Sequence, residues 1–486
     1  MRWTVKEVAG ALGVTPPGGV DPLARLAGVS INSRTLLRDE LFVAIHGPRH
    51  DGHDYIVAAL EGGALAAVVA ADRVAAYPDG VRPRLFAVPD TLAALQDLAR
   101  AVRTVWNRRL AGVTGSAGKT TTKEILAALL SARFRVLKSE GNLNNEYGLP
   151  LQLLRLEESD EAAVVELGMS HSGEIRQLAK IARPDVGVVT RVAPVHLEFF
   201  NSVEEIALAK RELIEGLSGK ESVSVLNADD PLVAQFAKVA PGRVVTYGIA
   251  EPADFCAEKI EDRGLHGTEF DFLGPDERMR LRLPLAGRHN ISNALAALAA
   301  ASVWGVGARE AQAVFPTLEA TGMRGRVVQY EAGFTVINDC YNSNPVALNA
   351  MVGLLTSTPA QGRHILAAGE MLELGATSAE LHRQCGRAAA SSGKLGWIVG
   401  VQGEAENLVR GAIEGGQPAA QSKFFPTSAE AGEFLATIVA AGDVVLVKGS
   451  RGVKMERIVE ALDARFSRAQ ADSNAPALSG APKERA

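Results

Sequence analysis

Residues 114–120 read Thr114-Gly115-Ser116-Ala117-Gly118-Lys119-Thr120, between an apolar run at Leu110–Val113 and a helix-forming segment at Thr121–Leu130. A strand, a glycine turn and a helix start in this order form a cradle for phosphate, because backbone N–H groups at the helix start point at the anion. The lysine of such a loop reaches the β- and γ-phosphates, and the hydroxyl after it holds Mg²⁺. The stretch predicts an ATP-binding α/β domain in which residues 114–121, Thr121 included, surround the phosphates.

The spacing of this loop departs from the commonest phosphate-binding pattern. Val113 stands where the first glycine of the eight-residue pattern would be. A plain glycine turn before a helix is therefore the alternative for the motif taken alone, and the rest of the chain has to decide.

The composition limits what the chain can do. Its 486 residues suggest about three domains, and 51 basic against 56 acidic residues leave a net charge of −5, which gives no footprint for nucleic acid. No apolar run approaches the roughly 20 residues of a membrane span, and the first residues lack the apolar core of a signal peptide. The three cysteines form neither a disulfide framework nor a metal motif. We expect a cytoplasmic protein, monomeric, that neither binds nucleic acid nor inserts into a membrane.

The order of strand-like and helix-like segments indicates three domains and a tail. Residues 1–108 predict a smaller α/β domain ending in a helix at Leu92–Trp106, and residues 109–321 predict a mostly parallel sheet whose last long helix, Asn290–Trp304, is buried. Residues 322–466 predict a Rossmann-like doubly wound domain, and residues 467–486 a disordered tail. The predicted strands of the second and third regions are Ala162–Val165, Val186–Thr190, Ser222–Leu226, Phe334–Ile337, His364–Ala368, Gly396–Val399 and Asp443–Val447.

Polar side chains follow three of these strands at the point where each strand ends. Glu166 follows the first, Asp339 comes soon after the strand at Phe334–Ile337, and Lys448 follows the last. Ligands of open α/β sheets bind beyond the carboxyl ends of the strands, so core packing does not explain these clusters.

Together with other motifs in the same order, these segments resemble the Mur ligases, ATP-dependent enzymes that form amide bonds in peptidoglycan precursors. The resemblance covers nearly the whole chain except the tail. The motifs that carry it are Asn32-Ser33-Arg34, Leu41-Phe42-Val43-Ala44-Ile45, Asp51-Gly52-His53-Asp54, the phosphate loop, Gly141-Asn142-Leu143-Asn144-Asn145-Glu146-Tyr147-Gly148-Leu149-Pro150, Glu166-Leu167-Gly168-Met169, His196-Leu197-Glu198, Ala209-Lys210-Arg211-Glu212, Gly287-Arg288-His289-Asn290-Ile291-Ser292-Asn293, Asn338-Asp339-Cys340-Tyr341-Asn342 and Lys448-Gly449-Ser450-Arg451.

The resemblance implies an activity. In the family, ATP phosphorylates a carboxylate of a UDP-linked substrate, an amine attacks the resulting acyl phosphate, and catalysis is mainly positioning and charge neutralisation. The segments Gly141–Pro150 and Lys448–Arg451 favour the branch that adds a dipeptide. Its substrates would be UDP-N-acetylmuramoyl-tripeptide and D-alanyl-D-alanine.

The resemblance also implies two Mg²⁺ sites. Thr120 and Glu166 would hold the first, since Mg²⁺ prefers hard oxygen ligands. His196 and Lys210 would serve the second, with Lys210 carbamylated so that a cation becomes an anionic oxygen ligand. The alternative for Glu166 is a helix- or turn-capping acid, which its place at the end of a strand disfavours. The alternatives for the other two residues are a packed or solvated histidine at His196 and a solvated helix face at Lys210. We name Lys119, His196 and Lys210 as catalytic.

Other residues are assigned to the two ends of the substrates. Asn290 and Asn293 lie three apart on one helical face and would contact adenine, while capping of the helix fits Asn290 equally well. The resemblance assigns phosphate contacts to Arg324, with Arg326 as an alternative, and nucleotide contact to Asp339. The predicted substrate-binding residues are Ser33, Arg34, Asn144, Asn145, Lys448 and Arg451.

Other interpretations of the chain stay open. A sibling ligase adding meso-diaminopimelate or lysine is the nearest, and folylpolyglutamate or cyanophycin synthetases share the ATPase part. A nucleotide-binding protein of cell-wall assembly without ligase activity is the alternative from another class. A metal cluster at His46, His50 and His53 is disfavoured because its loop spacing is irregular. Asn32 stands where relatives commonly carry Asp, so its contact is uncertain.

Overall fold

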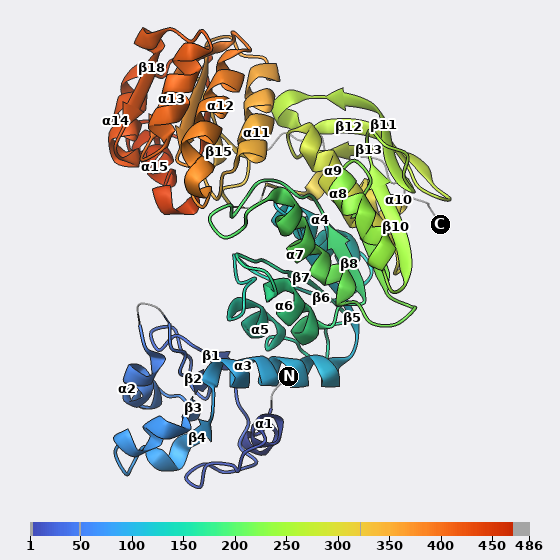
Figure 1. Ribbon diagram of the computed structural model, residues 1–486, viewed down its shortest axis with the longest axis vertical. Helices are drawn as coiled ribbons and strands as arrows, with labels where there is room; N and C mark the ends of the chain where they lie inside the picture. Colours follow the sequence, from blue (N-terminus) through green and yellow to red (C-terminus); the bar gives the residue numbers. More distant parts are fainter. Residues whose placement is uncertain (1–2, 48–49, 321, 470–486) are drawn as a thin grey trace, which may run out of the picture. The chain divides into compact units, whose positions relative to one another are not determined.

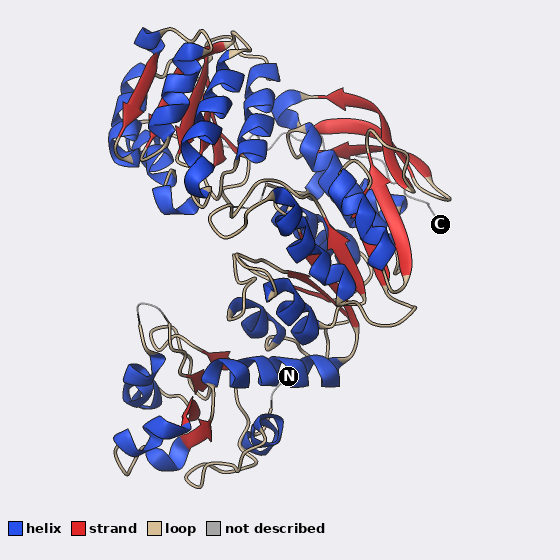
Figure 2. Cartoon of the chain, viewed as in Figure 1, coloured by secondary structure: helices blue, strands red, loops and turns tan. Residues whose placement is uncertain are grey.

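The computed structural model describes residues 3–47, 50–320 and 322–469. Contacts divide the described chain into two compact units: one runs to Glu319 and also takes in Glu373–Gly375, and the other contains the rest. The structure contains three sheets, shown in Figures 1 and 2, each with helices packed on it. No helix among the described residues has the length and apolar character needed to cross a membrane.

The first sheet is small and entirely parallel, in the order β1-β2-β3-β4. Its strands read as short apolar runs, and Leu41 to Ala44 are all buried. Asp90 caps α3 by accepting from the backbone N–H groups of Leu92 and Ala93, and α3 packs against α1, α5 (Gly148–Leu153) and α6 (Glu174–Ala182). The elements are α1 (Val5–Leu12), β1 (Val29–Ser30), β2 (Leu41–Val43), α2 (Ile56–Glu61), β3 (Ala66–Ala70), β4 (Leu85–Val88) and α3 (Thr91–Trp106).

The second sheet has nine strands in the order β13-β12-β11-β10-β9-β8-β5-β7-β6. Every position of β7, β8 and β9 is buried, as expected for parallel strands with helices on both faces. Its elements are β5 (Arg109–Thr114), α4 (Lys119–Ser131), β6 (Val136–Lys138), α5 (Gly148–Leu153), β7 (Ala162–Glu166), α6 (Glu174–Ala182), β8 (Val186–Val189), α7 (Val203–Glu215), β9 (Val223–Asn227), α8 (Pro231–Ala234), β10 (Arg243–Gly248), β11 (Phe255–Asp262), β12 (Thr268–Leu273), β13 (Arg278–Leu283), α9 (Arg288–Ser302) and α10 (Ala308–Val314).

One feature of this sheet agrees with the expectation from the sequence, and another was not expected. The expectation of a buried alanine-rich helix is confirmed, because Ala294–Ala301 of α9 are fully buried and α9 packs against α4. The antiparallel extension β11-β12-β13 was not expected. Its strand β12 does carry the signal of a half-buried strand, since buried and partly exposed positions alternate from Thr268 to Leu273.

The third sheet forms the core of the second unit, in the order β14-β15-β19-β16-β17-β18. All its strand pairs are parallel except β14 with β15. Helices α11, α12 and α13 pack in succession, and α14 packs against α15, so helices flank the strands as Figure 2 shows. Its elements are β14 (Arg326–Gln329), β15 (Thr335–Asp339), α11 (Pro345–Ser357), β16 (His364–Gly369), α12 (Ser378–Ala390), β17 (Leu395–Val401), α13 (Ala405–Glu414), β18 (Ser422–Phe425), α14 (Ser428–Ile438), β19 (Val444–Lys448) and α15 (Glu456–Arg465).

The chain end differs from the expectation of a disordered tail starting at residue 467. Residues 467–469 lie beside β14: the Ser467 carbonyl accepts from the Glu331 N–H at 3.0 Å, and the Ala469 N–H donates to the Gln329 carbonyl at 2.9 Å. Arg468 forms a bridge with Tyr330 and an ion pair with Asp463. The remainder of the predicted tail, 470–486, lies outside the described residues.

Candidate active site

Three neighbouring strands of the second sheet bring the predicted site residues to one edge. Strand β5 lies between β7 and β8 and is parallel to both, so their carboxyl ends meet. The phosphate loop follows β5, Glu166 is the last residue of β7, and the segment from Thr190 to His196 follows β8. Residues far apart in the sequence thus converge because β7 and β8 lie on opposite sides of β5 in the sheet.

The loop turns into α4 through Gly118, which has a φ of 86°. A Cβ atom at this position would lie 2.3 Å from Oδ1 of Asn293, so only glycine permits this approach of α9 to the loop. No side chain caps α4. The first N–H groups of a helix need partners, and an anion held at this end would supply them.

The loop is fastened to the segment after β8. The Ser116 N–H donates to the Arg191 carbonyl at 2.6 Å, and the Ser116 hydroxyl both donates to the carbonyl and accepts from the N–H of Ala193. The Thr190 hydroxyl donates to the Ala117 carbonyl at 2.6 Å. On the other side the Thr114 hydroxyl donates to the Leu167 carbonyl at 2.9 Å. These contacts set the loop shape before any ligand binds.

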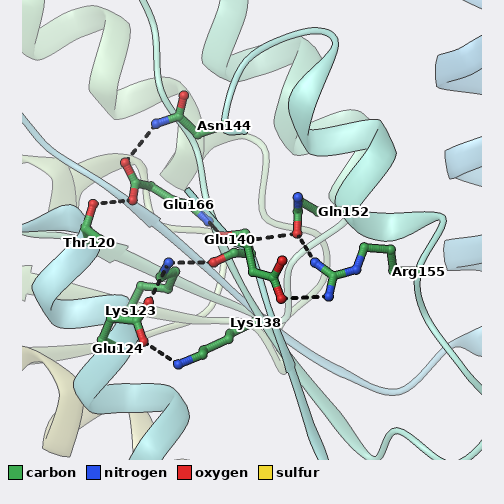
Figure 3. Close-up of polar contacts among 10 residues, drawn as sticks. Thr120, Lys123, Glu124, Lys138, Glu140, Asn144, Gln152, Arg155 and Glu166 are labelled. Carbon is green, nitrogen blue, oxygen red and sulfur yellow. Dashed lines mark hydrogen bonds and ion pairs between the residues drawn. The ribbon is translucent and has the colours of Figure 1, made fainter. Parts of the chain in front are cut away.

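Glu166 stands directly beside the helix start. Its Oε2 accepts a hydrogen bond of 2.7 Å from the Thr120 hydroxyl, and its Oε1 accepts one of 2.8 Å from the Asn144 amide, as Figure 3 shows. Thr120 and Glu166 are both buried, with 8% and 4% of the side chain exposed. A hydroxyl and a carboxylate oxygen in contact at a phosphate loop suit Mg²⁺, which completes its coordination with phosphate and water. Asn144, predicted to bind substrate, thus lies in contact with this carboxylate.

Two lysines lie near the loop. The Lys119 ammonium donates to the Gly115 carbonyl at 2.8 Å, so its stem curls back over the loop. Lys210, on α7, is buried with only 2% of its side chain exposed, which contradicts the solvated helix face suggested by the sequence alone. Burial, and secondly the charge of Lys119, lower the pKa of Lys210 well below its ordinary value. A neutral amine is the form that reacts with CO₂.

His196 lies on the same edge in a left-handed backbone conformation, with a φ of 56°. Its Nδ1 pairs with the carboxylate of Glu373, a residue that the contacts group with the first unit, and this histidine lowers the pKa of Glu373. Among the described residues no hydrogen bond or ion pair links His196 to Glu166 or Lys210. Nor do three His, Cys, Asp or Glu residues gather into a metal cluster within the described ranges.

The two asparagines of α9 contact each other. The Asn293 amide donates to Oδ1 of Asn290 at 3.0 Å, and the Thr122 hydroxyl lies 3.4 Å from Oδ1 of Asn293. The capping alternative for Asn290 is wrong: the N-cap is Gly287, and the Asn290 side chain donates to the Ala286 carbonyl at 2.8 Å. Asn293 therefore lies against the phosphate loop, with Asn290 behind it.

The second unit has its own polar cluster at the ends of β15 and β19. Asp339 and Lys448 are register partners, and the buried Lys448 ammonium donates to Oδ2 of Asp339 at 2.6 Å and to the Asn342 carbonyl at 2.7 Å. Lys448, predicted to bind a substrate carboxylate, forms an ion pair with Asp339 in this structure. Arg451 is half-exposed and pairs with Glu456 at 2.6 Å.

The two arginines that were alternatives for the phosphate contact differ in setting. The Arg324 guanidinium lies 4.0 Å from the centroid of the Tyr341 ring. Such a cation–π contact holds the group in place while leaving its N–H donors in the plane. Arg326 opens β14 and is exposed.

The first sheet carries the remaining predicted residues. Oδ1 of Asn32 accepts from the Arg34 N–H at 3.0 Å, which fixes the turn at Ser33 in the way an aspartate would. Buried His53 is held by two hydrogen bonds: its Nδ1 donates to the Asp51 carboxylate at 2.6 Å, and its Nε2 accepts from the Ala70 N–H at 3.1 Å. Asn145 caps its own turn, since its Oδ1 accepts from the Gly148 N–H at 2.9 Å.

Some polar residues near the site received no role from the sequence. Glu212 is buried and accepts from the N–H groups of Gly173 and Arg176, so it holds the start of α6. Lys123 of α4 is buried, and the Ser139 hydroxyl accepts from the Glu166 N–H at 3.1 Å. The helical spacing did contain a signal for Lys123, because it lies one turn after Lys119 and so projects from the same helix face.

Profiles of known families match all three parts of the chain. The Mur ligase family catalytic domain matches residues 25–103, the Mur ligase middle domain residues 113–301, and the Mur ligase glutamate ligase domain residues 323–451. A curated relative from Bacillus subtilis strain 168, named UDP-N-acetylmuramoyl-tripeptide–D-alanyl-D-alanine ligase, is 34% identical over 95% of this chain and 98% of its own length. The chain belongs to the Mur ligase family.

Other Mur ligases agree in sequence and in structure. A relative of the same name from Escherichia coli K12 is 36% identical over 90% of this chain and 94% of its own. The crystal structure of MurF from Acinetobacter baumannii superposes with a TM-score of 0.85 at 29% identity, covering 95% of this chain and 99% of that one. MurF from Thermotoga maritima in complex with ADP gives 0.76 at 30% identity, with 90% and 97% covered. The expected three-domain α/β architecture, with a parallel phosphate-loop sheet and a Rossmann-like sheet, is confirmed.

Proposed function

We propose that this Mur ligase joins D-alanyl-D-alanine to UDP-N-acetylmuramoyl-tripeptide, with cleavage of ATP to ADP and phosphate, in the synthesis of peptidoglycan precursors. Relatives that carry this activity in their names are 34% and 36% identical over at least nine-tenths of the chain. Use of ATP follows from membership of the family and from the relative seen with ADP.

The observation that carries the chemistry is the contact between Thr120 and Glu166 beneath the phosphate loop. It places a hydroxyl and a carboxylate where a nucleotide-bound cation needs oxygen ligands. These two residues would hold the first Mg²⁺, which when bound neutralises phosphate charge and orients the γ-phosphoryl group. His196 would contribute to a second site through Nε2, since Nδ1 contacts Glu373.

The proposed reaction has two steps, the formation of an acyl phosphate and the attack of an amine on it. An oxygen of the tripeptide carboxylate bonds to the γ-phosphorus while the bond to the β-phosphate oxygen breaks, and ADP leaves. The amine of D-alanyl-D-alanine then bonds to the acyl carbon, loses a proton, and the carbon–oxygen bond to phosphate breaks. Lys119 offsets the repulsion between carboxylate and triphosphate in the first step, and the fixed loop keeps the reacting atoms aligned.

Lys210 would serve as the carbamate. Its neutral amine nitrogen bonds to the carbon of CO₂ and releases one proton, which leaves a carboxylate-like group. The burial of Lys210 and its lowered pKa support this role, because a buried charged ammonium beside Lys119 is unfavourable.

The contacts with the ends of the substrates are assigned to side chains of both units. Asn293 would contact adenine with Asn290 supporting it, and Arg324 would contact phosphate. Ser33, Arg34, Asn144 and Asn145 would serve the UDP-sugar and peptide end. In the second unit Asp339 would contact the nucleotide, and Lys448 and Arg451 would bind substrate carboxylates.

Release of ADP measures the proposed function directly. The purified full-length chain is incubated with ATP and Mg²⁺ together with each substrate alone and with both, and the product mass is recorded. The tripeptide is supplied with meso-diaminopimelate or with lysine at its third position, and D-alanyl-D-alanine competes with single amino acids. We expect ADP release and a dipeptide-extended product only with both substrates. Nucleotide binding without substrate-dependent turnover would overturn the proposal in favour of a non-enzymatic nucleotide-binding protein.

A further inference from the structure

Lys123 is a buried lysine that the proposed chemistry does not use. It lies on α4 one turn after Lys119, with 1% of its side chain exposed. Its ammonium group donates to the Ser139 carbonyl at 2.5 Å. It also lies 2.8 Å from Oε1 of Glu124, and Figure 3 shows Lys123 and Glu124. A buried ammonium persists only where such partners compensate its lost hydration, so the place of Lys123 is tightly defined.

Ser139 connects this lysine to the site. Its backbone N–H donates to the Val164 carbonyl of β7 at 3.0 Å, and its hydroxyl accepts from the Glu166 N–H at 3.1 Å. The carbonyl that Lys123 holds and the hydroxyl that holds Glu166 thus belong to one residue. A shift of Ser139 would move the backbone of Glu166.

The loop after Ser139 returns to the same carboxylate. Asn144 donates its amide to Oε1 of Glu166 at 2.8 Å, and its carbonyl accepts from the Gly168 N–H at 2.8 Å. The start of the loop is held from the other side by buried Gln152, whose Oε1 accepts from the Glu140 N–H at 3.1 Å, and Figure 3 shows both attachments. Hydrogen bonds therefore hold Glu166 both at its backbone N–H and at one carboxylate oxygen.

The charge of Lys123 is matched locally. Burial raises the pKa of Glu124, but hydrogen bonds and proximity to Lys123 and Lys138 lower it overall, so Glu124 stays ionised next to the lysine. The half-exposed Lys138 pairs with the other oxygen of Glu124. Because the charge of Lys123 is paired with Glu124, we expect Lys123 to act on the site by positioning Ser139 and not through its electrostatic field.

We propose that Lys123 is a positioning residue for Glu166: by holding the Ser139 carbonyl, it fixes the Ser139 hydroxyl and the Asn144 amide that present the Glu166 carboxylate to the nucleotide-bound cation. This inference rests on the proposed function for the identity of the cation site. Groups that orient a metal-binding side chain commonly change metal affinity by 10- to 100-fold when removed.

The test compares Lys123→Met with Lys138→Met. Both substitutions remove a lysine from Glu124, but only Lys123 contacts Ser139. Binding of ADP is measured by calorimetry across a series of Mg²⁺ concentrations and without Mg²⁺, and kcat and KM are measured beside it. We expect the Mg²⁺ concentration for half-maximal ADP binding to rise at least about tenfold in Lys123→Met and less than about twofold in Lys138→Met. Metal-free ADP binding should stay within about twofold of the wild type in both.

Ser139→Ala carries the test independently, because it removes a single hydroxyl and keeps the test open if Lys123→Met unfolds. We expect Ser139→Ala to raise the Mg²⁺ concentration for half-maximal ADP binding as well. The variant that carries both Lys123→Met and Ser139→Ala should need no more Mg²⁺ than the more affected single variant, since both substitutions act through Ser139. A wild-type Mg²⁺ requirement in Lys123→Met or Ser139→Ala would overturn the inference, and so would additive effects or an equal loss in Lys138→Met. Absence of ligase product from the wild-type chain would instead reject the proposed function, while the Mg²⁺-dependent binding would still decide the role of Lys123.

Discussion

The hydroxyl of Thr120 and the carboxylate of Glu166 are joined by a hydrogen bond of 2.7 Å, although helix α4 and strand β7 that carry them are separated by a strand and a helix in the chain. Both groups are hard oxygen donors, and both are buried. The pair exists because β5 and β7 are neighbours in the sheet. A substitution that removes the charge of Glu166 but keeps its hydrogen bond with Thr120 therefore tests cation binding without disturbing the fold.

Glu166→Gln should lower kcat by at least about 100-fold, since removal of one electrostatic partner of a developing charge commonly has this effect. Stability should change by less than about 1 kcal/mol, because glutamine keeps the volume and the Thr120 hydroxyl can donate to its oxygen or accept from its amide. Initial rates of ADP release and thermal unfolding are the measurements. The exposed Glu221→Gln serves as the control, and equal activity of the two variants would remove Glu166 from the site.

Lys119→Met should abolish detectable turnover, with a loss of about 1,000-fold or more, because the phosphates lose a cation that lies over the loop. The helix should remain, since methionine has a helix propensity close to that of lysine. Lys180→Met, on the exposed side of α6, is the matched control. Near-normal product formation by Lys119→Met would show that the loop does not act on the phosphates.

Gly118→Ala should weaken ADP binding by at least about tenfold. At this position a Cβ would meet Oδ1 of Asn293 at 2.3 Å, and the φ of 86° is itself unfavourable for alanine. Gly219→Ala provides the comparison, because Gly219 has a similar φ of 80° but no heavy atom within 4 Å of the added Cβ. Gly219→Ala should lose about 1–2 kcal/mol of stability through backbone strain, and Gly118→Ala should lose at least as much because its Cβ also meets Asn293. Only Gly118→Ala should affect calorimetric ADP binding.

Much of this architecture could be predicted from the sequence because its signals are local. The apolar runs at β5, β7 and β19 and the glycines of the loop define strands, a turn and a helix within a few residues of chain. The antiparallel strands β11–β13 escaped prediction, since their half-buried pattern is weaker than that of fully buried strands.

Side-chain partners across the fold were harder to predict than elements. The sequence did not reveal that Lys448 forms an ion pair with its register partner Asp339. It also did not reveal that the Asn144 amide donates to Glu166. Both outcomes depend on which strands are neighbours, and no spacing within a single segment records that.

Asp51 supplies a test of pH dependence in the first domain. Burial raises its pKa, but hydrogen bonds from the backbone and side chain of His53 and the side chain of His46 lower it from 3.8 to about 2. A carboxyl whose folded pKa is depressed stabilises the fold above its unfolded pKa, and this contribution is lost as pH falls through the folded value. The free energy of unfolding of the wild type should therefore exceed that of Asp51→Asn by about 2 kcal/mol at pH 7.

The difference between wild type and Asp51→Asn should stay constant from pH 7 to about 5 and shrink between about pH 4 and 2. Hydrogen exchange of the peptides around Ala70, whose N–H donates to His53, reports this region within the whole chain. A difference that is the same at pH 3 as at pH 7 would contradict the depressed pKa.

Lys210→Ala should reduce kcat by at least about 100-fold, because a ligand group of the second cation would be missing. Short carboxylates such as formate or acetate should restore part of the activity, since they supply the oxygen anion that the carbamate provides. Lys220→Ala, an exposed lysine in the loop after α7, should keep wild-type activity with or without them.

The proposed carbamylation of Lys210 can also be tested without turnover. Buried beside Lys119, the Lys210 amine has a pKa well below its usual range, so it is neutral over more of the pH range than a solvated lysine and reacts with CO₂ under mild conditions. Chain equilibrated with ¹³C-bicarbonate should show a carbamate signal by NMR that is absent from Lys210→Ala and present in Lys220→Ala. If Lys210→Ala retains the signal, or remains fully active without added carboxylate, then Lys210 is a buried structural amine and the second cation must find its oxygen elsewhere.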